Sequence, residues 1–211
     1  PGAHDFARCA VSRGVLVALA HTTADYGEVK AACAAGFTHA THFYNAMTGV
    51  HREGEYKREG TVEGIYLTDE MTVEVIADGI HVPPALLRMA YKFKGAERVA
   101  LVTDSMAAGA MPEGGKPFDP RVIVEDGVCK LADRSALAGS IATADRLIRT
   151  MVREAGVPLA DAVRMASETP ARIMGISDRK GTLEAGKDAD VILFDDDITV
   201  RAVFVGGRRV K

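Results

Sequence analysis

The sequence predicts an α/β fold built on a buried parallel sheet. Over the first half of the chain, short and nearly continuous apolar segments alternate with helical patterns, which is typical of parallel strands covered on both faces. Four of these segments end in or near a side chain that can do chemistry: His21, His42, His81 and Asp104. Because the active site of a (β/α)8 barrel lies at the carboxyl ends of its strands, this regularity indicates candidate functional residues along one edge of the sheet.

The first two predicted strands are short, and each carries a histidine near its end. Residues 15–20 are apolar and partly β-branched, and they end at His21. A helical pattern follows over about residues 25–35, closed by a glycine where a helix end is expected. The second strand, residues 38–43, carries His42.

Two further strands complete the alternation. After an irregular polar stretch at residues 49–64, the third strand spans residues 72–77. A helix over residues 83–93 opens with two prolines, which the first turn of a helix tolerates well. The fourth strand, residues 98–103, ends at Asp104.

Beyond Asp104 the pattern changes. Residues 121–131 read as a β-hairpin with Asp126 and Gly127 as its two-residue turn. Two helices and two short strands are expected after it, at about residues 142–155, 159–174, 190–194 and 200–205.

The composition excludes several classes of protein. The 211-residue chain is 47% apolar and 26% charged with a net charge of −3, so neither nucleic acid nor a membrane surface is expected as a partner. No apolar run reaches the roughly 18 residues of a membrane span. The three cysteines, Cys9, Cys33 and Cys129, lie far apart without CxxC spacing, which argues against a zinc ribbon or a disulfide scaffold and favours a cytoplasmic location.

Two histidines are candidate metal ligands. His21 and His42 are separated by 21 residues, about one strand–helix unit, so they are expected side by side on adjacent strands. Two converging neutral imidazoles form a partial coordination set for zinc and leave positions for a carboxylate and water. A lone histidine is more often structural, and His39, three residues before His42, is interpreted in that way because strand alternation puts the two on opposite faces.

Asp104 is the candidate acid–base group. A carboxylate beside a metal could take a proton from bound water and return it to a leaving amine. The alternative is a helix cap or a surface turn.

Four segments of the chain occur at residues 41–47, 77–82, 101–106 and 137–140. Their order and rough spacing are those of motifs in the N-acetylglucosamine-6-phosphate deacetylase family, which the chain therefore resembles. The tail, including residues 180–190, resembles the wider amidohydrolase superfamily. The resemblance implies the C-terminal half of a (β/α)8 TIM barrel, strands five to eight, at residues 1–185. Residues 186–211 are then strands of a small β-domain, and the N-terminal half, with a metal-binding glutamate, is expected to be missing.

The resemblance also implies an activity. It is the metal-dependent hydrolysis of N-acetylglucosamine 6-phosphate to glucosamine 6-phosphate and acetate, a step of amino-sugar catabolism. His21 and His42 would bind a divalent ion, with zinc the first choice and iron, manganese or cobalt as alternatives, and Asp104 would be the catalytic acid and base. The residues implied to hold the sugar phosphate are Asn45, Ala46, Arg52, His81, Leu137, Ala138 and Gly139.

Several alternatives stay open at this point. Counting forward along the motif selects Arg52 for the phosphate, whereas counting back from residues 60–64 selects Arg58, and Arg52 is slightly favoured. There are two rival functions. One is a related amidohydrolase that acts on N-acetylgalactosamine 6-phosphate or on an N-acyl amino acid, and the other is a binding module without catalysis. The complete enzyme is expected to be a cytoplasmic homodimer, and the 211-residue chain alone is expected to be inactive.

Overall fold

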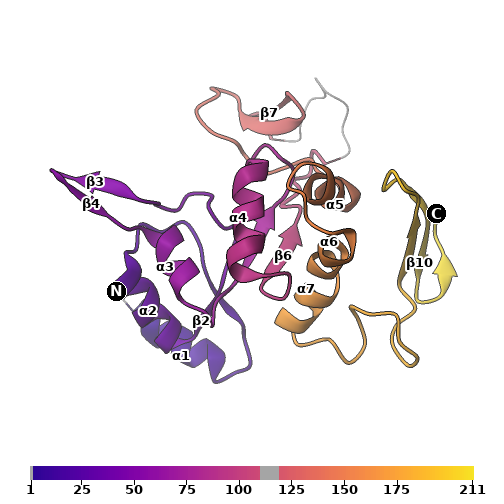
Figure 1. Ribbon diagram of the computed structural model, residues 1–211, viewed down its shortest axis with the longest axis horizontal. Coiled ribbons are helices and arrows are strands. Elements are labelled where there is room, and N and C mark those ends of the chain that lie inside the picture. Colours follow the sequence, from indigo (N-terminus) through magenta and orange to yellow (C-terminus); the bar gives the residue numbers. More distant parts are fainter. Residues whose placement is uncertain (1, 110–118) are drawn as a thin grey trace.

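The computed structural model describes residues 2–109 and 119–211, and its centre is a four-stranded sheet (Figure 1). All of its strand pairs are parallel, so the carboxyl ends of the strands lie at the same edge. The four predicted strands are confirmed, each slightly shorter than expected. In spatial order they are β1 (Val17–Leu19), β2 (Phe37–Ala40), β5 (Thr72–Ile76) and β6 (Val99–Val102).

Helices connect the strands of this sheet. The predicted helices after β1 and β5 are confirmed as α2 (Tyr26–Ala35) and α4 (Pro84–Lys94). Helix α2 begins at a capping box, in which the Asp25 carboxylate accepts from Glu28 N and Glu28 accepts from Asp25 N. Helix α1 (Ala3–Val11), which precedes β1, was not predicted from the sequence.

The expectation of an irregular stretch at residues 49–64 was wrong. The structure has a two-stranded hairpin there, β3 (His51–Glu53) and β4 (Tyr56–Arg58), followed by α3 (Thr61–Leu67). All six hairpin residues are exposed, so the segment has none of the apolar alternation by which a half-buried strand is identified. In Figure 1 the hairpin projects away from the body of the molecule.

The predicted hairpin after β6 is confirmed as β7 (Val122–Glu125) and β8 (Val128–Leu131). Its turn residues Asp126 and Gly127 have φ of 55° and 73°, as a two-residue hairpin turn requires.

The C-terminal helices differ in one respect from the prediction. Helix α5 (Ala144–Arg153) is confirmed, but the single helix expected at residues 159–174 is two, α6 (Leu159–Ala166) and α7 (Glu168–Ile173). Ser167 leaves the helical region, with φ of −135°. Pro170 lies three residues further on and has no N–H for a bond to the preceding turn, which explains the break.

The tail forms a separate three-stranded antiparallel sheet, in the order β11-β10-β9. Its strands are β9 (Val191–Phe194) and β10 (Val200–Val205), which were predicted, and β11 (Arg208–Arg209), which was not. Figure 1 shows this sheet beside α5 to α7, apart from the parallel sheet. Arg149 and Arg153 of α5 join the two parts: Arg149 Nη2 donates to Ile198 O at 2.9 Å, and Arg153 pairs with Asp197 at 2.7 Å.

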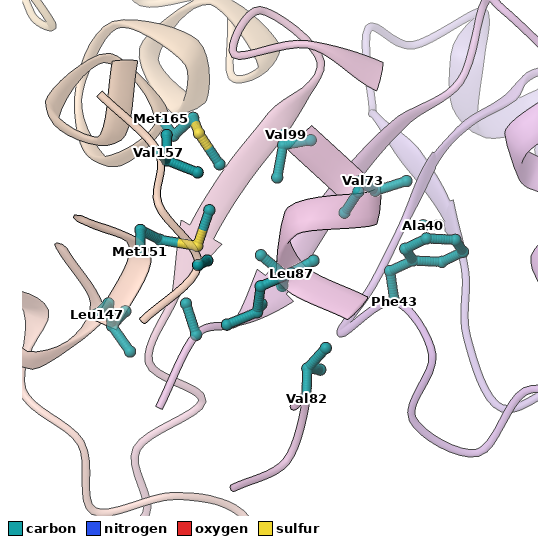
Figure 2. Packing of buried hydrophobic residues seen from close by; sticks show 14 of the residues in the cluster. Ala40, Phe43, Val73, Val82, Leu87, Val99, Leu147, Met151, Val157 and Met165 are labelled. Atoms are coloured by element: carbon teal, nitrogen blue, oxygen red, sulfur yellow. The ribbon is translucent and has the colours of Figure 1, made fainter. Parts of the chain in front are cut away.

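The main core lies between the parallel sheet and its helices (Figure 2). Val73 of β5 and Val99 of β6 pack with Leu87 of α4, Met151 of α5 and Met165 of α6, and all five are fully buried. Burial of one such side chain stabilises the fold by about 1.5–3 kcal/mol. This core therefore fixes the strands whose carboxyl ends carry the candidate residues. In the part of the chain that the structure describes, no helix is both long and apolar enough to cross a membrane.

Candidate active site

His21, His42 and Asp104 follow β1, β2 and β6, so all three lie at the carboxyl edge of one sheet. Their backbones share an uncommon conformation, with φ of 45°, 32° and 46°. A non-glycine residue in this left-handed region costs of order 1–3 kcal/mol, and such residues cluster at active sites and ligand clamps. The backbone strain at these three residues, whose side chains can all do chemistry, supports a functional site at the carboxyl edge of the sheet.

The structure brings His21 and His42 together. Their Nε2 atoms are 2.9 Å apart and their ring centroids 4.7 Å apart. The strands that carry them are paired, and Thr41 N donates to Leu19 O at 2.9 Å just before the two histidines. The expectation that these histidines emerge side by side is confirmed. Two nitrogens this close can both lie within the ligand distance of about 2.0–2.1 Å from one zinc ion.

Glu74 of β5 holds the backbone at His42. The next residue, Phe43, is fully buried, and its N–H donates to Glu74 O at 2.7 Å. The His42 N–H donates to Glu74 Oε1 at 3.2 Å. Burial alone would raise the pKa of Glu74, but hydrogen bonds from His39 and from the His42 N–H outweigh it and lower that pKa. An ionised carboxylate of β5 therefore holds the backbone of one candidate ligand.

The pair fits a metal as a partial ligand set. His42 Nε2 faces His21 Nε2 at 2.9 Å and can bind a ligand, whereas His42 Nδ1 is buried without a hydrogen-bond partner in the described structure. Among residues 2–109 and 119–211, no group of three or more His, Cys, Asp and Glu side chains that could hold a metal is found. Two imidazoles alone leave at least two positions of a tetrahedral zinc ion to other donors.

His39 takes no part in this pair. Its ring is buried, with Nδ1 2.8 Å from Thr72 Oγ1 and Nε2 3.4 Å from Glu74 Oε2. These contacts agree with its interpretation as a structural residue.

Asp104 lies beside the segment at residues 137–139. Ser140 N donates to Asp104 O, and Met106 N donates to Ser140 O, both at 2.9 Å. Gly139 has φ of +71°, and a Cβ there would lie 2.5 Å from Met106 Cγ and 3.2 Å from Asp104 O. Glycine is therefore needed for this close approach. No helix begins at Asp104 within the described residues, so the helix-cap alternative is wrong.

Asn45 and Ala46 belong to a tight loop that follows His42. Asn45 donates twice to His42 O, from its backbone N at 2.9 Å and from Nδ2 at 3.1 Å. Ala46 has φ of 52°, and a bridge between Thr22 and Met47 ties the end of this loop to the residue after His21. Both candidate substrate residues thus lie next to the histidine pair.

His81 lies in the turn after β5 and is paired with Asp78. Its Nδ1 is 2.8 Å from Asp78 Oδ2, and both side chains are buried. Burial would raise the pKa of Asp78, but bonds from the His81 ring and from the N–H groups of Ile80 and His81 lower it.

Arg52 and Arg58 both lie on the projecting β3–β4 hairpin. Arg58 Nε donates to Glu53 Oε2 at 2.9 Å, and Arg52 stands opposite Lys57 in the register. Within the described ranges, no hydrogen bond or ion pair joins either arginine to His42, His81 or Asp104. The structure therefore brings together the histidine pair and its loops, but not the candidate phosphate arginine.

Sequence reasoning missed three residues that hold the site: Glu74, Asp78 and Arg146. Asp78 could have been found, because an aspartate three residues before a histidine in a turn can accept from its backbone and ring. Arg146 donates to Asp78 O from 68 residues away, and no local pattern predicts that contact.

Comparison with known proteins gives consistent results over nearly the whole chain. A sequence model of the Amidohydrolase family matches residues 5–210. The chain is 38% identical over 206 residues to an N-acetylglucosamine-6-phosphate deacetylase of Danio rerio, covering 94% of this chain and 50% of that protein. It is 37% identical over 198 residues to an N-acetylgalactosamine-6-phosphate deacetylase of Escherichia coli O157:H7, covering 93% of this chain and 51% of that protein.

A solved structure is similar throughout. A mutant N-acetyl-D-glucosamine-6-phosphate deacetylase from Mycobacterium smegmatis, in complex with N-acetyl-D-glucosamine-6-phosphate, superposes with a TM-score of 0.90 at 37% identity. The match covers 99% of this chain and 55% of that one. The chain spans about half the length of the curated relatives it matches.

Proposed function

The chain belongs to the amidohydrolase family, and from that premise we propose that it carries the catalytic residues of an N-acetylglucosamine-6-phosphate deacetylase. The reaction is hydrolysis of the acetamide to give glucosamine 6-phosphate and acetate. The observation that carries this proposal is the His21–His42 pair, with Nε2 atoms 2.9 Å apart, on the same sheet edge as Asp104. The names of relatives at 37–38% identity support the substrate class.

The fold supports a more specific architecture. We propose that the four parallel strands, with the helices packed against them, are strands five to eight of a (β/α)8 barrel and form half of it within residues 1–185. The antiparallel tail sheet lies within residues 186–211 and is assigned to a small β-domain. The relatives are about twice as long as this chain, which is consistent with the remaining barrel strands and an acidic metal ligand lying in a part of the protein outside these residues.

His21 and His42 would hold a divalent ion. Zinc is the first choice because imidazole is one of its usual ligands, and iron, manganese and cobalt are the alternatives. When bound there, the ion supplies Lewis acidity, which polarises the acetamide carbonyl and lowers the pKa of a water.

Asp104 is the group that moves the proton. It is exposed at the end of β6, and the Ser140 hydrogen bond to its carbonyl fixes its backbone. Its carboxylate accepts a proton from the attacking water, whose oxygen bonds to the acetyl carbon. It then gives that proton to the amino-sugar nitrogen as the C–N bond breaks, so that acetate and a free amine leave.

The substrate contacts come from the loops around these groups. The Asn45–Ala46 loop, His81 and residues 137–139 are proposed to hold the sugar phosphate, because phosphate is bound by charge-assisted and N–H hydrogen bonds. Arg52 is the favoured phosphate arginine, since Arg58 is already engaged by Glu53. We propose that the complete enzyme works as a cytoplasmic homodimer.

The second candidate substrate is N-acetylgalactosamine 6-phosphate, which one relative at 37% identity favours. A substrate panel tests both: the purified full-length protein, supplied with zinc, is assayed for free amine from the two 6-phosphates and from unphosphorylated N-acetylglucosamine. The largest kcat/KM is expected on N-acetylglucosamine 6-phosphate. A preference for the galactosamine epimer would replace the first proposal by the second, and absence of amine release from every acetylated sugar would reject both.

A further inference from the structure

One carboxylate holds both the ring and the backbone of His81. Asp78 Oδ1 accepts from Ile80 N and His81 N, each at 2.8 Å, and Oδ2 lies 2.8 Å from His81 Nδ1. The side chains of Asp78 and His81 are 1% and 5% exposed. Because these donors surround an ionised carboxylate that can only accept, Nδ1 of His81 must carry a proton. Nε2 is then the ring nitrogen left for a ligand, and no hydrogen bond from the described residues reaches it.

Arg146 of α5 holds the same turn from a second direction. Its Nη2 donates to Asp78 O at 2.9 Å, and its Nη1 donates to Gly127 O at 3.1 Å. Gly127 lies in the turn between β7 and β8. One planar guanidinium thus joins the turn that carries His81 to the hairpin beyond β6, with the fixed geometry of its donors.

The hairpin in turn carries the other candidate substrate segment. Ala138 N donates to Cys129 O at 3.0 Å, and Leu137 forms a bridge with Lys130, so residues 137–139 lie along β8. The adjoining Ser140 is bonded to Asp104 O. Hydrogen bonds, joined by short stretches of backbone, therefore connect His81 through Asp78, Arg146 and β8 to Asp104.

We propose that Asp78 and Arg146 are positioning residues for the recognition of a phosphate monoester. Asp78 selects the nitrogen of His81 that faces the ligand, and Arg146 fixes the distance between His81 and residues 137–139. Neither residue touches the substrate. The ligand class rests on the proposed function, whereas the two positioning roles rest on the contacts alone. A purely structural role for Arg146 would affect stability without changing affinity for phosphate.

The role of Asp78 is tested by the protonation state of one ring. In 15N-labelled full-length protein at pH 8, long-range proton–nitrogen spectra distinguish the two histidine tautomers, and His81→Gln assigns the His81 signals. The native protein is expected to show the proton on Nδ1. Asp78→Asn keeps an oxygen for the backbone N–H groups but turns an NH2 toward Nδ1, so the proton should move to Nε2. Asp78→Glu, which keeps the carboxylate, should retain the native tautomer. An Nδ1 proton that persists in Asp78→Asn overturns this role.

The role of Arg146 is tested by titrating the same protein with inorganic phosphate while observing His81. Arg146→Met should weaken phosphate binding about tenfold, the effect of misaligning one hydrogen bond to a charged group, since about 1.4 kcal/mol corresponds to a factor of ten in affinity. Arg146→Lys should recover part of the loss. Arg153→Met is the matched control, since Arg153 lies on the same helix and its one ion-pair partner among the described residues is the exposed Asp197. Equal phosphate affinity in Arg146→Met and in the control overturns the proposal.

Kinetics separate this inference from the proposed function. Arg146→Met should raise KM for N-acetylglucosamine 6-phosphate and change kcat less. If the native protein hydrolyses no acetylated sugar phosphate, the proposed function fails, and the tautomer and the phosphate titration still decide the two positioning roles. If it is active and Arg146→Met leaves KM unchanged, the positioning role of Arg146 fails alone.

Discussion

Ser140 donates its backbone N–H to the carbonyl of Asp104 at 2.9 Å, so a segment distant in the sequence lies against the end of β6. Gly139 makes this approach sterically possible, because its φ is +71° and a Cβ there would meet Met106 Cγ at 2.5 Å. The placement of Asp104 therefore depends on a glycine that has no side chain to contribute to chemistry.

We predict that Gly139→Ala reduces kcat/KM for the deacetylation. Gly175→Ala is the matched control, since Gly175 has φ of +69° but no atom within 4 Å of the added Cβ. Both variants should lose about 1–2 kcal/mol of stability from backbone strain, measured by thermal or urea unfolding. Only Gly139→Ala should displace the Asp104 loop and lower activity. Equal activity in the two variants would contradict the role given to this contact.

Asp104→Asn is expected to leave the fold and the bound metal unchanged and to reduce kcat by roughly 10²–10⁴-fold, the usual contribution of a general acid–base group. The amide cannot accept a proton from water at neutral pH. Turnover is measured by amine release and metal content by elemental analysis. Asp178→Asn, at an exposed aspartate outside the sheet edge, serves as control. A kcat close to the native value in Asp104→Asn would assign proton transfer to another group.

The combined variant His21→Ala, His42→Ala should bind less than one equivalent of metal, because it removes both imidazoles of the pair whose Nε2 atoms are 2.9 Å apart. His4→Ala, at an exposed position of α1, should keep the native metal content. Elemental analysis after dialysis gives the stoichiometry, and circular dichroism checks the fold. A folded double variant that retains stoichiometric metal would defeat the assignment of these ligands.

The parallel sheet could be predicted because its strands are buried, and burial leaves an apolar run in the sequence. His21 and Asp104 directly follow two of those runs and His42 lies near the end of a third, so their common edge was predictable from strand order alone. The β3–β4 hairpin was missed for the opposite reason, since all of its strand residues face solvent and show no apolar period.

The supporting contacts of the site could not be predicted because they are long-range. Arg146 reaches Asp78 across 68 residues, and Glu74 reaches the His42 N–H across 32 residues. Such contacts depend on which helices pack against which strand ends, and local spacing carries no information about that arrangement. The break between α6 and α7 was in principle visible as Pro170 within an otherwise helical pattern.

A buried lysine predicts how stability depends on pH. Burial lowers the pKa of Lys94 to about 8 from the ordinary lysine value of 10.5, against the opposing effect of Asp69. Between these two pKa values Lys94 binds more protons in the unfolded chain than in the folded one, so its contribution to stability rises with pH over this interval. We expect the free energy of unfolding of Lys94→Met to lack this rise, whereas exposed Lys92→Met should keep it. Urea unfolding at pH 8 and pH 10 measures the native protein and both variants. Burial raises the pKa of Cys33 and of Cys129, which opposes the rise in all three proteins, so the comparison between them is decisive. A change in stability between the two pH values that is the same in Lys94→Met as in the native protein would contradict the assignment.

The edges of the parallel sheet lead to the last prediction. Among the described strands, β1 pairs only with β2 and β6 only with β5, so each has a free hydrogen-bonding edge. Beside β1, Val15 and Leu16 are 54% and 41% exposed. They line an apolar groove of about 360 Å³ together with Met174. Exposed apolar strand edges pair readily with other chains, and parallel sheets are normally covered on both faces.

We therefore predict that residues 1–211, expressed alone, associate into oligomers or aggregates, bind metal weakly and do not deacetylate the sugar phosphate. Size-exclusion chromatography with light scattering measures the association. Leu16→Lys should reduce it, because a charge at the edge opposes pairing. Leu183→Lys, which replaces an 82% exposed leucine that belongs neither to the parallel sheet nor to this groove, should not. If the 211-residue chain is monomeric and active, or if both variants behave alike, the edges of β1 and β6 are not the places where further barrel strands pair. The assignment to strands five to eight must then be abandoned.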